Sequence, residues 1–200
     1  MESKKAYYID CLRSKFETYT PISQSSWELM LPILNFQEIQ KGEDLLQNGQ
    51  VARYIHFICK GALRAYITDS EGNTYNKNIF LENDFAASTV SCLRSKPSSF
   101  TLEALEDCIL INIDYKKYKK LIEDTIEFKN FYIAYLENNW VIEKEQREIS
   151  LVMDNATERY LKLLKQYPNI DQRIQQLHLA AHLGITPTQL SRIRKELKTS

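Results

Sequence analysis

The sequence is poor in residues and motifs that mark redox or enzymatic chemistry. Its four cysteines, Cys11, Cys59, Cys92 and Cys108, are widely separated and form no C-x-x-C pair, so we expect them to be reduced, with most of them in the core. No nucleophile motif, phosphate-binding loop or dinucleotide fingerprint is present. The acidic residues offer no isolated pair that would serve as acid and base. The sequence therefore predicts no enzyme and no bound cofactor.

Long apolar runs are also missing. No stretch approaches the roughly 20 apolar residues that span a bilayer. The first ten residues, MESKKAYYID, lack the apolar core of a signal peptide. These absences predict a cytoplasmic protein with no membrane partner.

The chain contains only three histidines. His178 and His182 are four residues apart and could share a metal ion on one helix face, but the sequence places no third ligand nearby. We therefore expect both to pack against neighbouring residues, and no metal to be bound. His56 stands alone in a predicted strand and should belong to the core.

An excess of one charge is missing overall, because 26 basic residues balance 26 acidic ones. The distribution is uneven, however. The segment from Ser150 to the end has a net charge of +4, and the first 149 residues have −4. A basic C-terminal segment on an acidic body would confine phosphate contacts to one end of the protein.

Glycine is scarce, and four of the five glycines punctuate the first half of the chain. The sequence from Phe36 onward alternates short Ile-, Leu-, Phe- and Tyr-rich segments with turns at these glycines. This spacing predicts a jelly-roll barrel. We expect strands near 36–40, 44–47, 54–59, 62–68, 75–81, 100–105 and 108–113, preceded by helices over residues 1 to about 35 that pack on the barrel.

A long helix should follow Asp114 and run from about 126 to 153. Eight of its residues recur in alternating steps of four and three, which is the spacing of a coiled-coil seam with two polar positions. We predict a homodimer interface at Phe128, Tyr132, Tyr135, Asn139, Ile142, Gln146, Ile149 and Met153. The alternative is a helix that packs only on its own barrel, and the neighbouring stripe Phe131, Leu136 and Trp140 could do so.

The end of the chain indicates two helices joined by a tight turn. Gly184 can adopt the left-handed conformation that ends the first helix, and Thr186 can cap the second, which begins at Pro187. Leu190, Ile193 and Leu197 give this second helix an apolar inner face. Its opposite face is polar and basic. Such a helix could lie in a DNA major groove.

Three stretches resemble the Crp/Fnr transcription regulators. Gly184–Leu197, GITPTQLSRIRKEL, is similar to the DNA-reading helix of that family, while KGEDLLQNGQ (41–50) and YIHFICKGALRAYITDSEGN (54–73) resemble its cyclic-nucleotide-binding barrel. The resemblance implies an α+β protein in which residues 1–153 form a sensor barrel with a dimerisation helix. Residues 154–200 would form a winged-helix-like helix–turn–helix domain, and any wing must come from residues 169–177.

The resemblance also implies roles in DNA binding. Arg192 would contact a base, because a guanidinium can pair bidentately with guanine. Thr188 and Gln189 would contact neighbouring bases, and Arg194, Lys195 and Lys198 would hold phosphates with help from Thr186 and Ser191. The family's DNA-reading Arg-Glu pair is replaced by Pro187-Thr188, so the target sequence should differ.

The effector site departs from the family pattern. Ala87 and Ser88 replace the Gly-Glu pair that meets the sugar, and the segment Pro97–Thr101 has no arginine for the cyclic phosphate. A buried phosphate without a cation carries a large desolvation cost, so we expect no response to cyclic AMP. Two alternatives remain: a barrel that binds nothing, or a smaller or more apolar effector lined by Phe80, Ala87, Ser88, Thr89, Ser98, Ser99 and Phe100.

The sequence thus predicts a homodimeric regulator that binds a palindromic double-stranded DNA operator, with RNA polymerase as a possible further partner. The alternative is a small-molecule-binding barrel whose tail contacts proteins and not DNA.

Overall fold

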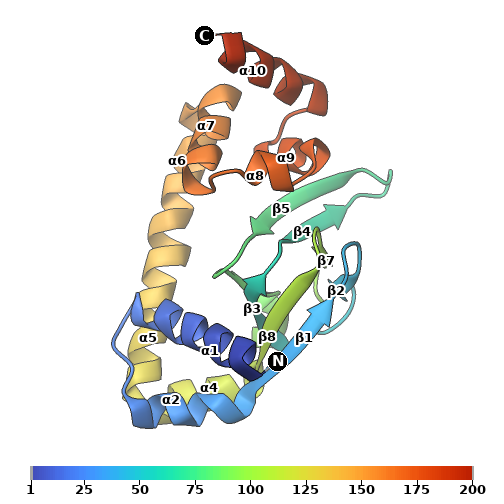
Figure 1. Cartoon of the computed structure of the whole chain (residues 1–200). Helices are drawn as coiled ribbons and strands as arrows, with labels where there is room; N and C mark the ends of the chain where they lie inside the picture. Colours follow the sequence, from blue (N-terminus) through green and yellow to red (C-terminus); the bar gives the residue numbers. More distant parts are fainter. Residues whose placement is uncertain (1, 200) are drawn as a thin grey trace.

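The computed structural model describes residues 2–199, with a barrel of two antiparallel sheets at its centre (Figure 1). One sheet has the order β1-β8-β3-β6 and the other β2-β7-β4-β5. The predicted α+β class with an N-terminal barrel is confirmed. The strands are β1 (Leu34–Ile39), β2 (Asp44–Leu46), β3 (Tyr54–Lys60), β4 (Leu63–Thr68), β5 (Thr74–Phe80), β6 (Phe85–Ala86), β7 (Thr101–Ala104) and β8 (Cys108–Asp114). Two short elements were not predicted: strand β6 and helix α3 (Thr89–Arg94).

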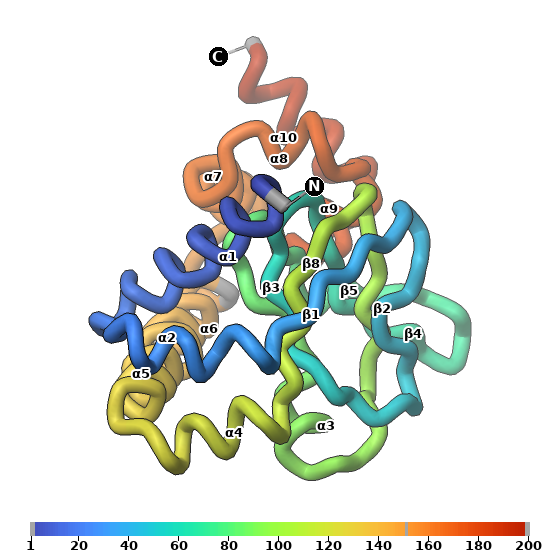
Figure 2. Tube along the Cα trace, turned by 60° about the horizontal axis from the view of Figure 1, so that its bottom comes forward, coloured from blue at the N-terminus to red at the C-terminus, as the bar shows by residue number. Residues whose placement is uncertain are grey.

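Helices cover one side of the barrel, as Figure 2 shows for α1 (Glu2–Glu17), α2 (Gln24–Met30), α4 (Tyr115–Asp124) and α5 (Ile126–Leu136). Their apolar faces meet at Phe16, which stacks on Phe131 with 4.0 Å between ring centroids and makes edge contacts with Trp27 and Phe85. This cover explains why β8 is buried along almost its whole length. A strand covered on both faces loses the alternation that marks a half-exposed strand.

The long helix consists of α5, a π-helical segment (Glu137–Ile142) and α6 (Glu143–Met153). A π-helical turn accommodates one extra residue, which corresponds to about 100° of rotation in a regular helix. Residues that share a face before the segment therefore turn onto a different face after it. The even four-and-three spacing of the sequence does not reveal this shift.

The predicted dimer seam divides at the π-helical segment. Phe128 is fully buried in its own chain, so its predicted place in the dimer interface is wrong, and Tyr132 and Tyr135 are half-buried beside it. Asn139 is half-buried and bonds to the hydroxyl of Tyr19. Beyond the segment, the remaining seam residues are exposed, namely Ile142, Gln146, Ile149 and Met153. In the neighbouring stripe, Phe131 is buried and Leu136 half-buried, whereas Trp140 is exposed.

The C-terminal segment folds back onto the edge strand β5 (Figure 1). It contains α7 (Ala156–Gln166), α8 (Ile170–Arg173), α9 (Gln176–Leu183) and α10 (Pro187–Thr199). Residues Ala62, Ile79, Leu81 and Leu105 of the barrel and Ile170, Ile174 and Leu179 of the C-terminal helices belong to one apolar cluster. The predicted wing is wrong, because residues 170–173 form α8 and no strand lies within residues 115–199.

Arg173 joins the C-terminal helices to the barrel through two carboxylates. Its guanidinium donates to both oxygens of Glu82, at 2.8 and 2.9 Å, and to both oxygens of Glu106, at 2.7 and 3.1 Å. Burial raises the pKa of Glu82, but hydrogen bonds from Arg173 and from the Gly61 N–H outweigh burial and leave this pKa below its usual value. The ion pair and the shared apolar cluster therefore hold the two parts together.

We predict that Arg173→Ala lowers the free energy of unfolding by about 1–3 kcal/mol, because two neighbouring carboxylates lose their cation. Urea denaturation at neutral pH measures this loss. A carboxyl whose pKa is lowered by folding stabilises the protein above that pKa and ceases to do so as the pH falls through it. The difference between wild type and variant should thus shrink in acid.

The matched control for this experiment is Lys144→Ala, which removes an exposed ion pair with Glu148. Its effect should stay below about 0.5 kcal/mol. An Arg173→Ala variant that is no less stable than this control would show that the contact does not hold the C-terminal helices.

Candidate nucleic-acid interface and effector region

A sharp turn orients α10 relative to α9. Gly184 ends α9 in the left-handed conformation, with φ of 69°, which a side chain would disfavour. Thr186 then caps α10, since its Oγ1 accepts from the Gln189 N–H at 3.1 Å, while Gln189 Oε1 accepts from the Thr186 N–H at 2.9 Å. This reciprocal capping box fixes the start of the helix at Pro187.

The inner face of α10 packs on α9 as predicted for two of three residues. Leu190 and Ile193 are buried with Leu179, Ala180 and Leu183. Leu197 was expected on the same face but is exposed, because the last turn of α10 extends beyond the helices that cover Leu190.

The outer face of α10 is polar and open to solvent. Of the predicted DNA-contact residues, Thr186, Thr188, Gln189, Ser191, Arg192, Lys195 and Lys198 are exposed. Arg192 borders an open hollow of about 430 Å³ between α10 and the start of α7, which Asn155 and Thr157 also line. The oxygen of the Gln189 amide is committed to the cap, so the NH₂ group of that amide is the part left to meet a base.

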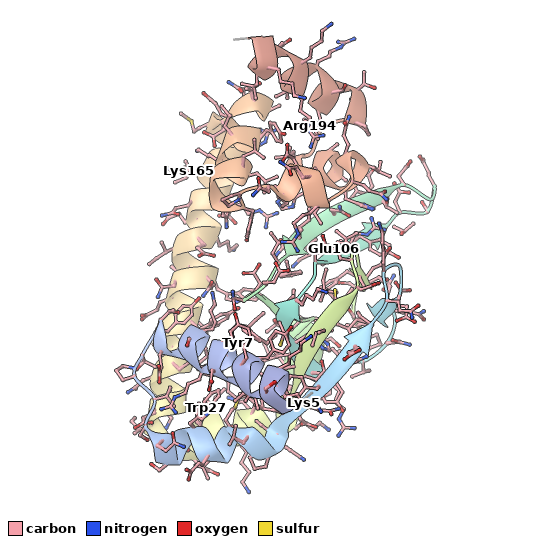
Figure 3. The ribbon with its side chains drawn as sticks, viewed as in Figure 1. Lys5, Tyr7, Trp27, Glu106, Lys165 and Arg194 are labelled. Atoms are coloured by element: carbon pink, nitrogen blue, oxygen red, sulfur yellow. The ribbon has the colours of Figure 1, made fainter. Side chains whose placement is uncertain are left out.

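Arg194 lies elsewhere than predicted. Its Nε donates to the hydroxyl of Tyr160 at 3.0 Å, and its guanidinium lies 5.7 Å from the centre of that ring. Figure 3 shows Arg194 between α10 and the helices beneath it. The side chain thus holds α10 against α7, and its predicted role as a phosphate contact is wrong. Arg194 was predicted to contact phosphate together with Lys195 and Lys198, but its contact with Tyr160 cannot be read from the sequence of the helix.

The predicted effector residues gather where α3 meets the strand β7, but their polar atoms bond to one another. Ser98 Oγ donates to the Phe100 carbonyl oxygen at 2.8 Å, and it lies 2.9 Å from Ser88 Oγ, whose hydroxyl can donate to it. Ser88, Ser98 and Phe100 are buried, Phe80, Ala87 and Thr89 are half-buried, and Ser99 is exposed.

The two buried hydroxyls have satisfied each other, and Ser98 has also bonded the backbone of Phe100. No basic residue occurs between Pro97 and Thr101 to meet a cyclic phosphate.

The histidines are held by protein groups. His56 bonds to Asn112 at 2.7 Å, and burial lowers the pKa of His56 to about 4. His178 Nδ1 is 3.1 Å from an Nη1 of Arg64 and accepts its hydrogen bond, since a guanidinium can only donate. His182 is half-buried one turn further along α9. Within residues 2–199, no three His, Cys, Asp or Glu side chains are grouped to hold a metal.

No helix among the described residues has the length and apolar character needed to cross a bilayer.

The comparisons with known proteins agree with the barrel. Residues 36–125 match the family of cyclic nucleotide-binding domains. The potassium channel GORK of Arabidopsis thaliana is 26% identical over 131 residues, which make up 58% of this chain but only 16% of the channel. The chain thus spans a small part of this curated relative.

Solved structures share the fold over nearly the whole chain. A regulatory protein from Silicibacter pomeroyi DSS-3 superposes with a TM-score of 0.71 and 16% identity, over 95% of this chain and 88% of that one. FixK2 from Bradyrhizobium japonicum gives 0.68 and 20%, over 84% and 85%. The barrel region of the chain is therefore similar to cyclic nucleotide-binding domains, and the fold of nearly the whole chain is shared with these solved structures.

The two arginines of α10 should behave oppositely in stability measurements. Arg194→Ala should lower the free energy of unfolding by about 1–2 kcal/mol, because it removes the bond to Tyr160 and the packing on its ring. Arg192→Ala should change it by less than about 0.5 kcal/mol, since that side chain is exposed. Thermal unfolding followed by circular dichroism compares them, and equal losses would contradict this assignment.

Proposed function

We propose that the protein is a sequence-specific DNA-binding transcription regulator of the Crp/Fnr type, in which residues 1–153 form the sensor and 154–200 the DNA-binding domain. The observation that carries the proposal is α10. It has a buried inner face, a capped start, and an exposed outer face bearing Arg192 and Lys198 at one end of the molecule (Figure 1). A protruding helix of this kind can enter a major groove.

The charge distribution supports the same surface. The segment from Ser150 onward carries a net charge of +4, whereas the rest of the chain carries −4. An acidic body repels the DNA backbone and a basic end attracts it, so binding would be oriented with α10 toward the duplex. Arg192 would read a base, while Lys195 and Lys198 would contact phosphates.

We further propose that the protein acts as a homodimer through the long helix. Its exposed surface carries apolar side chains on both sides of the π-helical segment, namely Ile126, Ile133, Trp140, Val141, Ile142, Ile149, Val152 and Met153. Exposed apolar area of this extent on one helix favours association. A two-fold dimer would present two copies of α10 to major grooves about 34 Å apart.

The effector, if one acts, should differ from cyclic AMP. Ser88 and Ser98 bond to each other, and the segment Pro97–Thr101 has no cation to offset the desolvation of a cyclic phosphate. We therefore expect DNA binding to be the same with and without cyclic AMP. We also propose that the protein works in the cytoplasm.

Substitution Ile149→Glu should produce monomers, because it sets a charge against the apolar surface of a partner helix. Sedimentation equilibrium of the purified protein measures the change in mass. Leu29→Glu, which alters an equally exposed leucine on α2, is the control and should leave the dimer intact. A wild-type protein that sediments as a monomer would contradict the proposed interface.

The operator can be found by selecting random duplexes on the purified protein at moderate salt, with and without cyclic AMP, and sequencing the survivors. We expect a palindrome that does not depend on the nucleotide. Failure to enrich any sequence at any salt concentration would argue against a DNA-reading role for α10.

With that operator, Arg192→Ala should weaken specific binding by about 1–3 kcal/mol and leave binding to a scrambled duplex nearly unchanged. Fluorescence anisotropy with both duplexes measures the two affinities. Arg192→Lys keeps the charge but loses bidentate pairing, so it should resemble the alanine variant on the operator. Equal losses on both duplexes would mean that Arg192 only touches phosphate.

A further inference from the structure

Arg147 of α6 reaches across to the edge of the barrel. Its Nη1 donates to Asn78 Oδ1 at 2.8 Å, and its Nη2 donates to the backbone oxygen of Lys77 at 2.9 Å. Both acceptors are neutral. β5 is the edge strand of its sheet, and its free backbone groups can therefore bind the guanidinium.

Lys77 is the extra residue of a β-bulge. In the pairing of β4 with β5, Ala65 faces Asn78 and Tyr66 faces Asn76, so Lys77 has no partner residue. Bulges of this kind redirect a side chain. The ammonium of Lys77 lies 5.1 Å from the centre of the Phe100 ring. Among the residues that the structure describes, no carboxylate bonds to Lys77 or to Arg147.

His182 approaches the same place from α9. The Nδ2 of Asn76 donates to the backbone oxygen of His178, which fixes α9 against β5 at that level. The charge of Arg147 contributes to the lowered pKa of His182, so the two side chains lie within electrostatic reach of each other. Its Nδ1 is buried without a hydrogen-bond partner.

The pKa values of Lys77 and His182 are both lowered. Burial lowers the pKa of Lys77, and the charge of Arg147 lowers it further. Burial lowers the pKa of His182 to about 4, and Arg147 again adds to the effect. A lysine whose charged form is disfavoured by a neighbouring arginine, with no carboxylate bonded to either, favours binding of a negative ion.

We propose that Lys77 and Arg147, with His182 behind them, bind a small anion bearing a phosphate or carboxylate group at the junction of β5, α6 and α9. The site borders the predicted effector region at the Phe100 ring, but its cations come from β5 and the long helix instead of from residues 97–101. A bound anion would bridge the two cations through charge-assisted hydrogen bonds.

This anion would link the three parts of the molecule. Lys77 belongs to the barrel, Arg147 to the long helix, and His182 to the helix that precedes α10. A ligand that binds better to one arrangement of these parts shifts the population toward it. The identification of the anion as the effector of the regulator rests on the proposed function, whereas the binding of the anion does not.

Inorganic phosphate is the probe, added in place of chloride at constant ionic strength while thermal unfolding of the full chain is followed. We expect a saturable rise in the melting temperature of the wild type. Lys77→Gln and Arg147→Gln should each raise the half-saturating phosphate concentration by roughly tenfold. Lys116→Gln, which removes an exposed lysine of α4, is the matched control and should behave as the wild type.

A second readout follows the His182 ring by NMR, with its signal assigned from the His182→Asn variant. Phosphate should shift this signal in the wild type and in Lys116→Gln, and should shift it much less in Arg147→Gln. The Lys77→Gln variant carries the test alone if Arg147→Gln does not fold. An absent melting shift, or an equal one in all variants without a His182 response, means an adventitious ion only and overturns the proposal.

The source of the anion is tested with a short non-operator duplex in chloride buffer. If the ligand of the site is a small free anion and not the DNA backbone, the Lys77→Gln variant should bind this duplex with the same affinity as the wild type. A drop in duplex affinity together with no phosphate response would assign the two cations to the DNA backbone and overturn the proposal. Phosphate binding by a protein that selects no DNA sequence would leave the site standing and reject the regulator.

Discussion

The contact between Arg173 and the two carboxylates of the barrel determines where the C-terminal helices lie. One guanidinium bonds both Glu82 and Glu106, and the apolar cluster around Ile170 and Leu179 continues directly into Ile79 and Leu81 of the barrel. The orientation of α10 depends on this arrangement, because α9 rests on β5 and the turn at Gly184 sets α10 relative to α9. The outward-facing surface is thus positioned by interactions well away from it.

Much of the fold can be predicted from the sequence, because the barrel strands are short, apolar and separated by glycine turns. The elements that were missed have physical reasons. β6 has only two residues, and a strand this short carries no periodic signal. Helix α8 occupies the segment expected to form a wing. A helical turn there lets Ile170 and Ile174 pack into the shared cluster, which stabilises the helix. Such tertiary packing overrides local preference.

The candidate sites show the same limit. The outer face of α10 could be predicted from helical spacing, but the role of Arg194 could not, because its side chain bonds to Tyr160, 34 residues earlier. The predicted dimer seam of the long helix was wrong at Phe128, because the π-helical segment turns the residues that follow it onto a different helix face. Nothing in the spacing of the sequence marks the inserted residue. Lys77 and Arg147 lie 70 residues apart and meet only through the fold.

The shared cluster has a consequence for how the chain folds. Arg173 contacts residues 67 and 91 positions earlier, so these contacts close very long loops and contribute a high contact order. The helices that present α10 follow the barrel strands in the chain, and they must dock on strands that are synthesised before them. Until these helices dock, the apolar side chains of Ile79, Leu81 and Leu105 are exposed to water on the barrel surface. The barrel and the C-terminal helices are therefore cooperative parts of one folding unit, and neither can be varied in sequence without regard to the other.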